Sequence, residues 1–193
     1  MIQAAVPYPV TLSVDFPDKP RDRVSVGFRV FLAIPIAIIL SALRGSILVF
    51  AAILMILFRQ KYPKWWFDWN LELTRFNTRV FSYFFLLRDE YPSTDEEQAV
   101  HLNLAYPDAK KDLSQGMPLV KWFLAIPHYF VLMFLGFAAV TCAIISWFAI
   151  LFTGKMPQSL FDFIVGVMRW GLRVAAYAFL LISDRYPPFS LEP

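Results

Sequence analysis

The chain has 193 residues, of which 58% are hydrophobic, 18% aromatic and 17% charged. Soluble domains are roughly half apolar and about a quarter charged, so this composition excludes an ordinary water-soluble domain and favours a membrane protein. The net charge of +3 comes from lysines and arginines spread among acids, which argues against a nucleic-acid partner. The single cysteine, Cys142, excludes an intramolecular disulfide and a multi-cysteine metal site.

The sequence contains two copies of one unit, which predicts a first repeat over residues 1–98 and a second over 99–193. The segment Phe-Leu-Ala-Ile-Pro occurs at residues 31–35 and again at 123–127. Further pairs follow in the same order: Phe67-Asp68 with Phe161-Asp162, Tyr83 with Tyr177, and Asp89, Tyr91 and Pro92 with Asp184, Tyr186 and Pro187. Matches that keep their order along a whole unit indicate an internal repeat.

Each repeat begins with an alternating stretch and continues with two helical ones. In the first repeat we expect a strand over about 10–16 and helices over about 28–58 and 65–87. In the second repeat we expect a strand over about 100–106 and helices over about 119–152 and 160–182. The predicted fold is therefore mainly α and membrane-embedded, with four long helices in two tandem strand-helix-helix repeats. The two strands are expected to pair antiparallel as a small β element on one membrane face.

The apolar runs of both repeats are long enough to cross a hydrocarbon core of about 30 Å. Two crossings per repeat give both copies the same orientation, related by a pseudo-twofold axis along the membrane normal. Lysine and arginine are more numerous beside the strands, so the positive-inside rule predicts a multi-pass membrane protein with both termini in the cytoplasm. The alternative is that each apolar run dips in and returns as a re-entrant hairpin, broken at Arg44-Gly45 in one repeat and at Gly136 in the other.

The candidate site is a charged stripe on the second helix of each repeat. Helical spacing places Asp68, Glu72, Arg75 and Arg79 on one face of the first copy, and Asp162, Gly166, Arg169 and Arg173 take the same places in the second. Charge inside a membrane helix is costly, so this face must meet protein, water or head groups.

Three interpretations of the charged stripe stay open. The acids and arginines can form an internal ion-pair seam. The four arginines can form a twofold-related site for a lipid phosphate, because guanidinium binds phosphate bidentately. The helices can also lie flat in the interface with the stripe in water.

The remaining polar residues favour structural roles. His101 and His128 have no counterpart in the other repeat and are expected to be structural, so no metal or cofactor is predicted. Trp65, Trp66 and Trp69 are typical of an aromatic belt at head-group level. The sequence contains no Gly-rich phosphate loop, nucleophile elbow or paired zinc-ligand spacing, and we predict no catalytic residues.

Several segments of the second repeat together form a specific pattern: residues 120–129, 147–154 and 160–163, Arg169-Trp170 and the segment 184–189. In these segments the second repeat resembles the domain-of-unknown-function 4389 family of bacterial membrane proteins. The first repeat is similar to a diverged relative, with Arg-Gln-Lys-Tyr-Pro at 59–63 where the second has Thr-Gly-Lys-Met-Pro at 153–157. The resemblance implies a bacterial membrane protein, which with the predicted topology places it in the cytoplasmic (inner) membrane. It supplies no activity.

These observations favour a non-enzymatic membrane scaffold or accessory subunit that can also bind anionic lipid. Its expected partners are the lipid bilayer, anionic phospholipid included, and another membrane protein or further copies of itself. The alternative is a small transporter or channel that acts as an oligomer, with a path at the pseudo-twofold interface. A lipid-modifying enzyme is the weakest hypothesis, because Asp68 and Asp162 are the only repeated carboxylates near the stripe.

Overall fold

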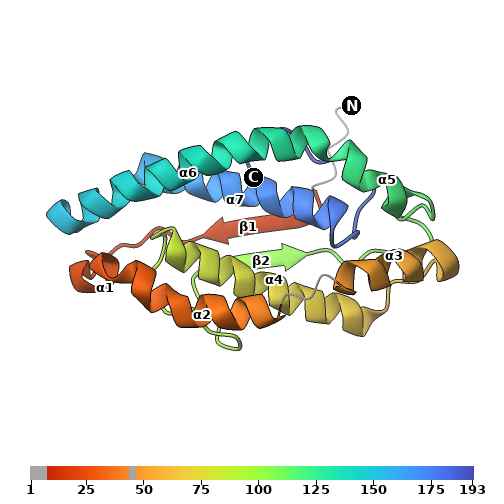
Figure 1. The fold of residues 1–193 in the computed structure, drawn as a ribbon, viewed down its shortest axis with the longest axis horizontal. Coiled ribbons are helices and arrows are strands. Elements are labelled where there is room, and N and C mark those ends of the chain that lie inside the picture. Colours follow the sequence, from red (N-terminus) through yellow and green to blue (C-terminus); the bar gives the residue numbers. More distant parts are fainter. Residues whose placement is uncertain (1–7, 44–46) are drawn as a thin grey trace, which may run out of the picture.

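A computed structural model describes residues 8–43 and 47–193, which form helices around one small sheet (Figure 1). The elements in chain order are β1 (Val10–Val14), α1 (Arg23–Gly27), α2 (Arg29–Leu43), α3 (Ile47–Arg59), α4 (Lys64–Phe84), β2 (Val100–Leu104), α5 (Met117–Leu124), α6 (Ile126–Thr153) and α7 (Gln158–Ala178). The described residues are thus mainly helical with one two-stranded antiparallel sheet, as expected.

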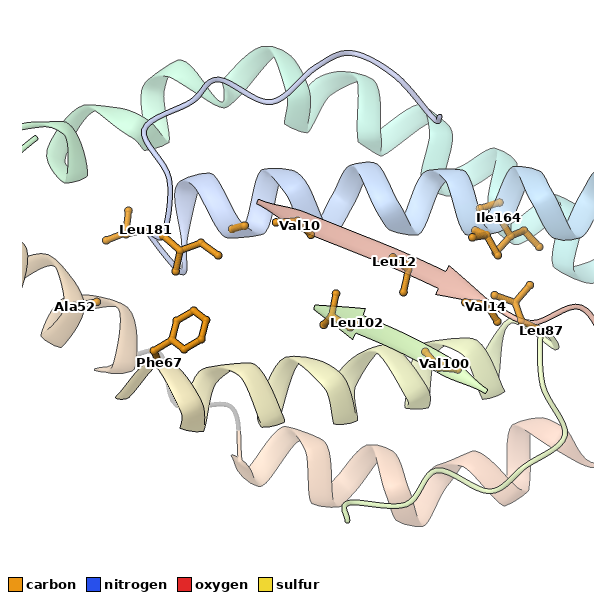
Figure 2. Packing of buried hydrophobic residues seen from close by; sticks show 14 of the residues in the cluster. Val10, Leu12, Val14, Ala52, Phe67, Leu87, Val100, Leu102, Ile164 and Leu181 are labelled. Carbon is orange, nitrogen blue, oxygen red and sulfur yellow. The ribbon is translucent and has the colours of Figure 1, made fainter. Parts of the chain in front are cut away.

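The sheet pairs the two predicted strands and buries one of its faces. Leu12 lies opposite Leu102 in the antiparallel register. Val10, Leu12 and Val14 alternate with exposed residues along β1, because successive strand side chains point to opposite faces. Figure 2 shows these side chains packed with those of β2. The same core includes Phe67 of α4 and Ile164 of α7.

The outer face of the sheet is polar. We call its four exposed side chains, Thr11, Ser13, His101 and Asn103, the polar face. His101 Nε2 lies 3.4 Å from a carboxylate oxygen of Asp15. Antiparallel sheets that pack one face on the core and leave the other in solvent show this alternation.

The strands are exchanged between the two repeats. Strand β1 belongs to the first repeat but packs against α7 of the second, while β2 of the second packs against α4 of the first. Helix α2 covers α4, and α6 covers α7. Across the molecule the order is therefore α2, α4, β2, β1, α7 and α6 (Figure 1), and neither repeat completes its own sheet.

Both strands run alongside the long helices rather than across their ends (Figure 1). A sheet capping one end of a helical bundle would sit on one membrane face, which is where the sequence led us to expect it. Here the sheet occupies the same stretch of the long axis as α4 and α7. The sheet therefore lies beside these helices and not at one end of the bundle.

The expectation of four uninterrupted helices needs correction. The expected helix 28–58 contains α2 and α3, and the Arg44-Gly45 break falls outside the described residues. The expected helix 119–152 is divided into α5 and α6 at Ala125, because Pro127 at the start of α6 cannot donate to a preceding turn. Helix α6 passes Gly136 without a break, so the second run is no re-entrant hairpin.

The described residues contain one helix that is long and apolar enough to cross a membrane, α6. Its 28 residues reach about 42 Å at about 1.5 Å per residue. Only 17% of its most apolar 18-residue window is buried, whereas the core helix of a soluble protein is mostly buried. Helices α2 and α3, with 15 and 13 residues, are apolar but too short to cross singly.

Candidate functional site

Two arginines of the charged stripe hold the outer edges of the strands. Arg75 Nε donates to the Leu102 carbonyl of β2 at 3.0 Å. Arg169 Nε and Nη2 donate to the Leu12 carbonyl of β1, both at 3.2 Å. Leu12 and Leu102 are register partners, so the two arginines cap equivalent carbonyls on opposite edges of the sheet. Each bond joins a helix of one repeat to the strand of the other.

The other two arginines of the stripe hold the segments that follow the second helices. Arg79 donates to the Ser93 carbonyl at 2.9 Å. Arg173 is 3% exposed and donates to the carbonyls of Ser190 and Glu192. The pseudo-twofold relation of the four arginines is thus kept in their contacts, and every one of them donates to backbone carbonyl oxygen.

The acids of the stripe lie apart from most of these contacts. Glu72 pairs with Arg75 at 2.6 Å, and Asp68 pairs with Lys64 at 2.8 Å. Asp162 is exposed near the start of α7. The arginines therefore bind mainly carbonyl oxygens. Of the three acids, Glu72 pairs with an arginine of the stripe, Asp68 pairs with a lysine, and Asp162 is exposed.

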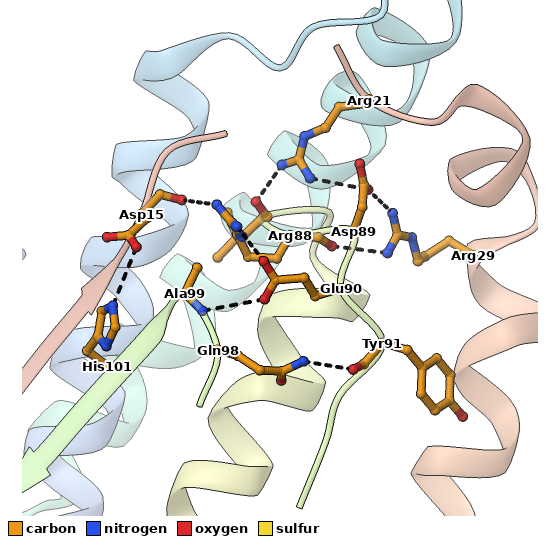
Figure 3. Close-up of polar contacts among 11 residues, drawn as sticks. Asp15, Arg21, Arg29, Arg88, Asp89, Glu90, Tyr91, Gln98, Ala99 and His101 are labelled. Atoms are coloured by element: carbon orange, nitrogen blue, oxygen red, sulfur yellow. Dashed lines mark hydrogen bonds and ion pairs between the residues drawn. The ribbon is translucent and has the colours of Figure 1, made fainter. Parts of the chain in front are cut away.

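The interior holds a second repeated constellation that the sequence interpretation missed. In the first repeat Arg29, 2% exposed, pairs with Asp89 and donates to the Arg88 carbonyl at 3.0 Å (Figure 3). Its guanidinium carbon lies 4.0 Å from the centre of the Tyr83 ring. A buried charge with a carboxylate, a carbonyl and an aromatic face around it is the arrangement that makes burial tolerable.

The second repeat contains the same arrangement around a lysine. Lys121, 0% exposed, pairs with Asp184 at 2.8 Å and donates to the Ser183 carbonyl at 2.8 Å. Its ammonium lies 5.2 Å from the centre of the Tyr177 ring. Burial lowers the pKa of Lys121, and the carboxylate of Asp184 opposes that shift. We call the groups around Arg29 and Lys121 the two cation clusters.

The two cation clusters differ in charge. In the first, Arg21 also reaches Asp89, at 3.2 Å, so two buried arginines share one carboxylate (Figure 3). Arg21 additionally donates to the carbonyls of Leu86 and Leu87. In the second repeat Leu113 precedes Lys121 by the same number of residues as Arg21 precedes Arg29, and it is buried among apolar side chains. The first cluster therefore carries one more positive charge than the second.

His128 occupies a structural position. It is fully buried, accepts a hydrogen bond at Nδ1 from Trp170 Nε1 at 3.0 Å, and stacks on Phe189 with ring centres 4.0 Å apart. Among the residues that the structure describes, no group of three or more His, Cys, Asp or Glu side chains is placed to hold a metal ion.

Comparison with known families also identifies two copies of one unit, one in each repeat. The profile of the family described as "Domain of unknown function (DUF4389)" matches residues 23–94 and again residues 118–190. The chain belongs to the DUF4389 family. No curated protein and no solved structure matches the chain.

Each DUF4389 match contains one cation cluster in full, except for Arg21. The matched ranges include Arg29 with Asp89, and Lys121 with Asp184, whereas both strands lie outside them. A signal for the clusters was present in the sequence, since Arg29 and Lys121 each stand two residues before the repeated Phe-Leu-Ala-Ile-Pro segment. Charged residues near the ends of membrane helices usually lie at head-group level, so their place in the sequence did not predict their burial.

Proposed function

We propose that this DUF4389 protein is a non-enzymatic membrane module, a scaffold or accessory subunit, with helices α2, α3 and α6 as its lipid-facing outer helices. The observation that carries the proposal is the exposed surface of α6. Phe130, Phe137 and Phe152 are 62%, 69% and 77% exposed, and the helix carries no Asp, Glu, Lys or Arg. A contiguous apolar surface of this kind marks contact with lipid or with another protein.

The outer helices belong in hydrocarbon rather than flat on a membrane surface. A helix that lies in the interface has a strongly polar face toward water. Helix α6 is apolar all round, and the charges of α2 and α3 stand at their ends, at Arg29 and Arg59. Such helices are stable when lipid or protein surrounds them.

The polar face of the sheet then serves as the docking surface for a partner. Because the strands run alongside α4 and α7, helices embedded in lipid bring the sheet toward the same depth. Polar side chains such as Thr11 and Asn103 are unfavourable against hydrocarbon. A second membrane protein, or a second copy of this chain, would cover them.

The contacts of the charged stripe support a structural role for its arginines. Arg75, Arg79, Arg169 and Arg173 already donate to backbone carbonyls, which leaves fewer donors for a lipid phosphate. Phosphate binding at the stripe, the multi-pass inner-membrane topology and the cytoplasmic termini stay predictions.

Site-specific photo-crosslinking in native membranes tests the proposal. A photoreactive phenylalanine analogue would replace Asn103 on the polar face or Phe137 on α6. We expect protein adducts from position 103 and lipid adducts from position 137. Protein adducts from position 137, with none from position 103, would instead identify α6 as the docking surface and contradict the proposal.

A further inference from the structure

A mainly apolar cavity of about 370 Å³ lies beside the first cation cluster, between the start of α2, the end of α4 and the middle of α6. Its walls include Val30, Phe84, Phe85, Val140, Ile144 and Phe148. Arg29 is the charged residue among the described residues that line it. Volumes of 300–1,000 Å³ are typical of small-molecule sites, and this cavity is at the small end of that range.

The guanidinium of Arg29 is not fully paired within the described part of the chain. Its Nη1 and Nη2 groups bind the Arg88 carbonyl and Asp89, but its buried Nε has no hydrogen-bond partner among the described residues. Buried N–H groups in folded proteins are nearly always paired, because an unpaired one loses its hydration without compensation. The Arg29 guanidinium in the cavity wall is therefore incompletely satisfied by the protein groups around it.

The charge of the first cluster defines the kind of acceptor. Arg21 and Arg29 share the single carboxylate of Asp89, while the neighbouring Arg88 is neutralised by Glu90 at 2.6 Å. Within residues 8–43 and 47–193, one buried positive charge therefore remains without a counter-ion. Such a charge favours an anionic ligand, since a charge-assisted hydrogen bond is stronger than a neutral one.

The walls define the rest of the ligand. Val30, Ile144 and Phe148 are all at least half exposed, so the cavity opens on the same apolar surface as the outer helices. A flexible hydrocarbon chain can enter from that surface and lie between α2 and α6. The small volume fits one chain better than two. The one uncompensated positive charge matches a carboxylate, with one negative charge, better than a phosphate monoester, with about −1.5 to −2 at neutral pH.

We propose that this cavity binds a fatty-acid carboxylate, with the chain against α6 and the carboxylate at the wall that Arg29 forms. The proposal concerns a site within the chain and does not depend on what covers the polar face of the sheet. It also gives a reason for Arg21, the charge by which the first cluster differs from the second.

Binding of three probes to the full chain in zwitterionic nanodiscs tests the proposal. Dodecanoate, dodecanol and dodecyl phosphate share a chain and differ in the head. We expect dodecanoate to bind at least about tenfold more tightly than dodecanol. Equal affinities would overturn the proposal, and tighter binding of dodecyl phosphate would overturn its carboxylate assignment in favour of a phosphate-headed lipid.

Two variants locate the site without removing Arg29. Ile144→Trp fills the cavity from an exposed wall and should weaken dodecanoate binding at least about tenfold. Its matched control is Phe137→Trp on the same helix, outside the cavity lining, which should bind as the wild type does. Equal affinities for the two variants would place the ligand elsewhere.

Arg21→Leu tests the charge argument. This substitution gives the first cluster the residue that the second repeat carries in that place, Leu113, and leaves the Arg29–Asp89 pair intact. We expect the affinities for dodecanoate and dodecanol to become nearly equal, with dodecanol binding unchanged. A full preference for dodecanoate in this variant would show that the shared carboxylate does not set the ligand charge.

Discussion

Buried positive charges define this protein at the scale of single residues. Arg29 and Lys121 lie in the interior at matching places, and each has a carboxylate, a carbonyl and a tyrosine ring around it. Removing one partner of such a pair leaves an uncompensated buried charge, which costs more than the intact pair contributes.

We expect Asp184→Asn to lower the free energy of unfolding by about 3–5 kcal/mol, because it leaves the Lys121 ammonium buried without its counter-ion. Denaturant unfolding in detergent micelles measures this loss. Asp162→Asn removes an exposed carboxylate from α7 and should change stability by less than about 0.5 kcal/mol. Equal effects of the two substitutions would show that the buried Lys121–Asp184 pair matters no more to the free energy of unfolding than an exposed carboxylate does.

The lowered pKa of Lys121 predicts a pH dependence with a defined sign. Below the lowered pKa, both folded and unfolded chains carry the charge, and the cost of burying it is fully present. Between that pKa and the ordinary lysine value of about 10.4, the unfolded chain binds more protons, so this residue makes stability rise with pH. Comparing unfolding free energies of wild type and Lys121→Met from pH 8 to 11 isolates the effect. A difference between the two proteins that is constant over this range would contradict the burial argument.

At the scale of elements, the strands are fixed by arginines of the opposite repeat, and the C-terminal tail is fixed by α7. A Cβ atom on Gly166 would lie 2.9 Å from the Leu191 Cβ and 3.1 Å from the Leu191 carbonyl oxygen. The absence of a side chain at this glycine therefore leaves room for Leu191 of the tail beside the helix. The same tail supplies the Leu191 carbonyl that Arg169 binds at 2.9 Å.

Gly166→Ala should displace the tail and cost about 1–3 kcal/mol, because added atoms in a packed contact force the backbone to shift. The control is Gly171→Ala on the same helix, where an added Cβ meets nothing within 4 Å and alanine favours the helix by up to about 1 kcal/mol. Limited proteolysis of the tail and thermal unfolding both report the difference. Equal resistance of the two variants would mean that the tail does not depend on this contact.

Much of the element pattern could be predicted from the sequence, and its assembly could not. Alternation identified both strands, and helical spacing identified α4 and α7 with their matching arginines. The division at Ala125 depends on Pro127, which begins a new helix instead of continuing the old one. The exchange of strands and the burial of Arg29 and Lys121 depend on contacts between distant segments, which periodicity within one segment does not report.

At the scale of the whole molecule, the repeats are interdependent because each supplies the strand that the other packs on its second helix. We therefore expect residues 1–98 and 99–193 to be unstable when produced singly and to associate when produced together. Co-purification of one tagged half with the other, untagged half measures the association. If each half were stable alone and the two did not associate, the repeats would not be interdependent.

The central claim is that the outer helices lie in lipid while a protein covers the polar face of the sheet. Single cysteines replace Phe137 or Thr11 in a Cys142→Ala background. Each variant is treated with a water-soluble maleimide, first in native membranes made permeable so that the reagent reaches both sides, and again after purification in detergent. The account predicts slow labelling at both positions in membranes, and fast labelling at position 11 alone once the protein is separated from its partner. Fast labelling at position 137 in native membranes would contradict the claim, because a side chain in hydrocarbon is closed to that reagent.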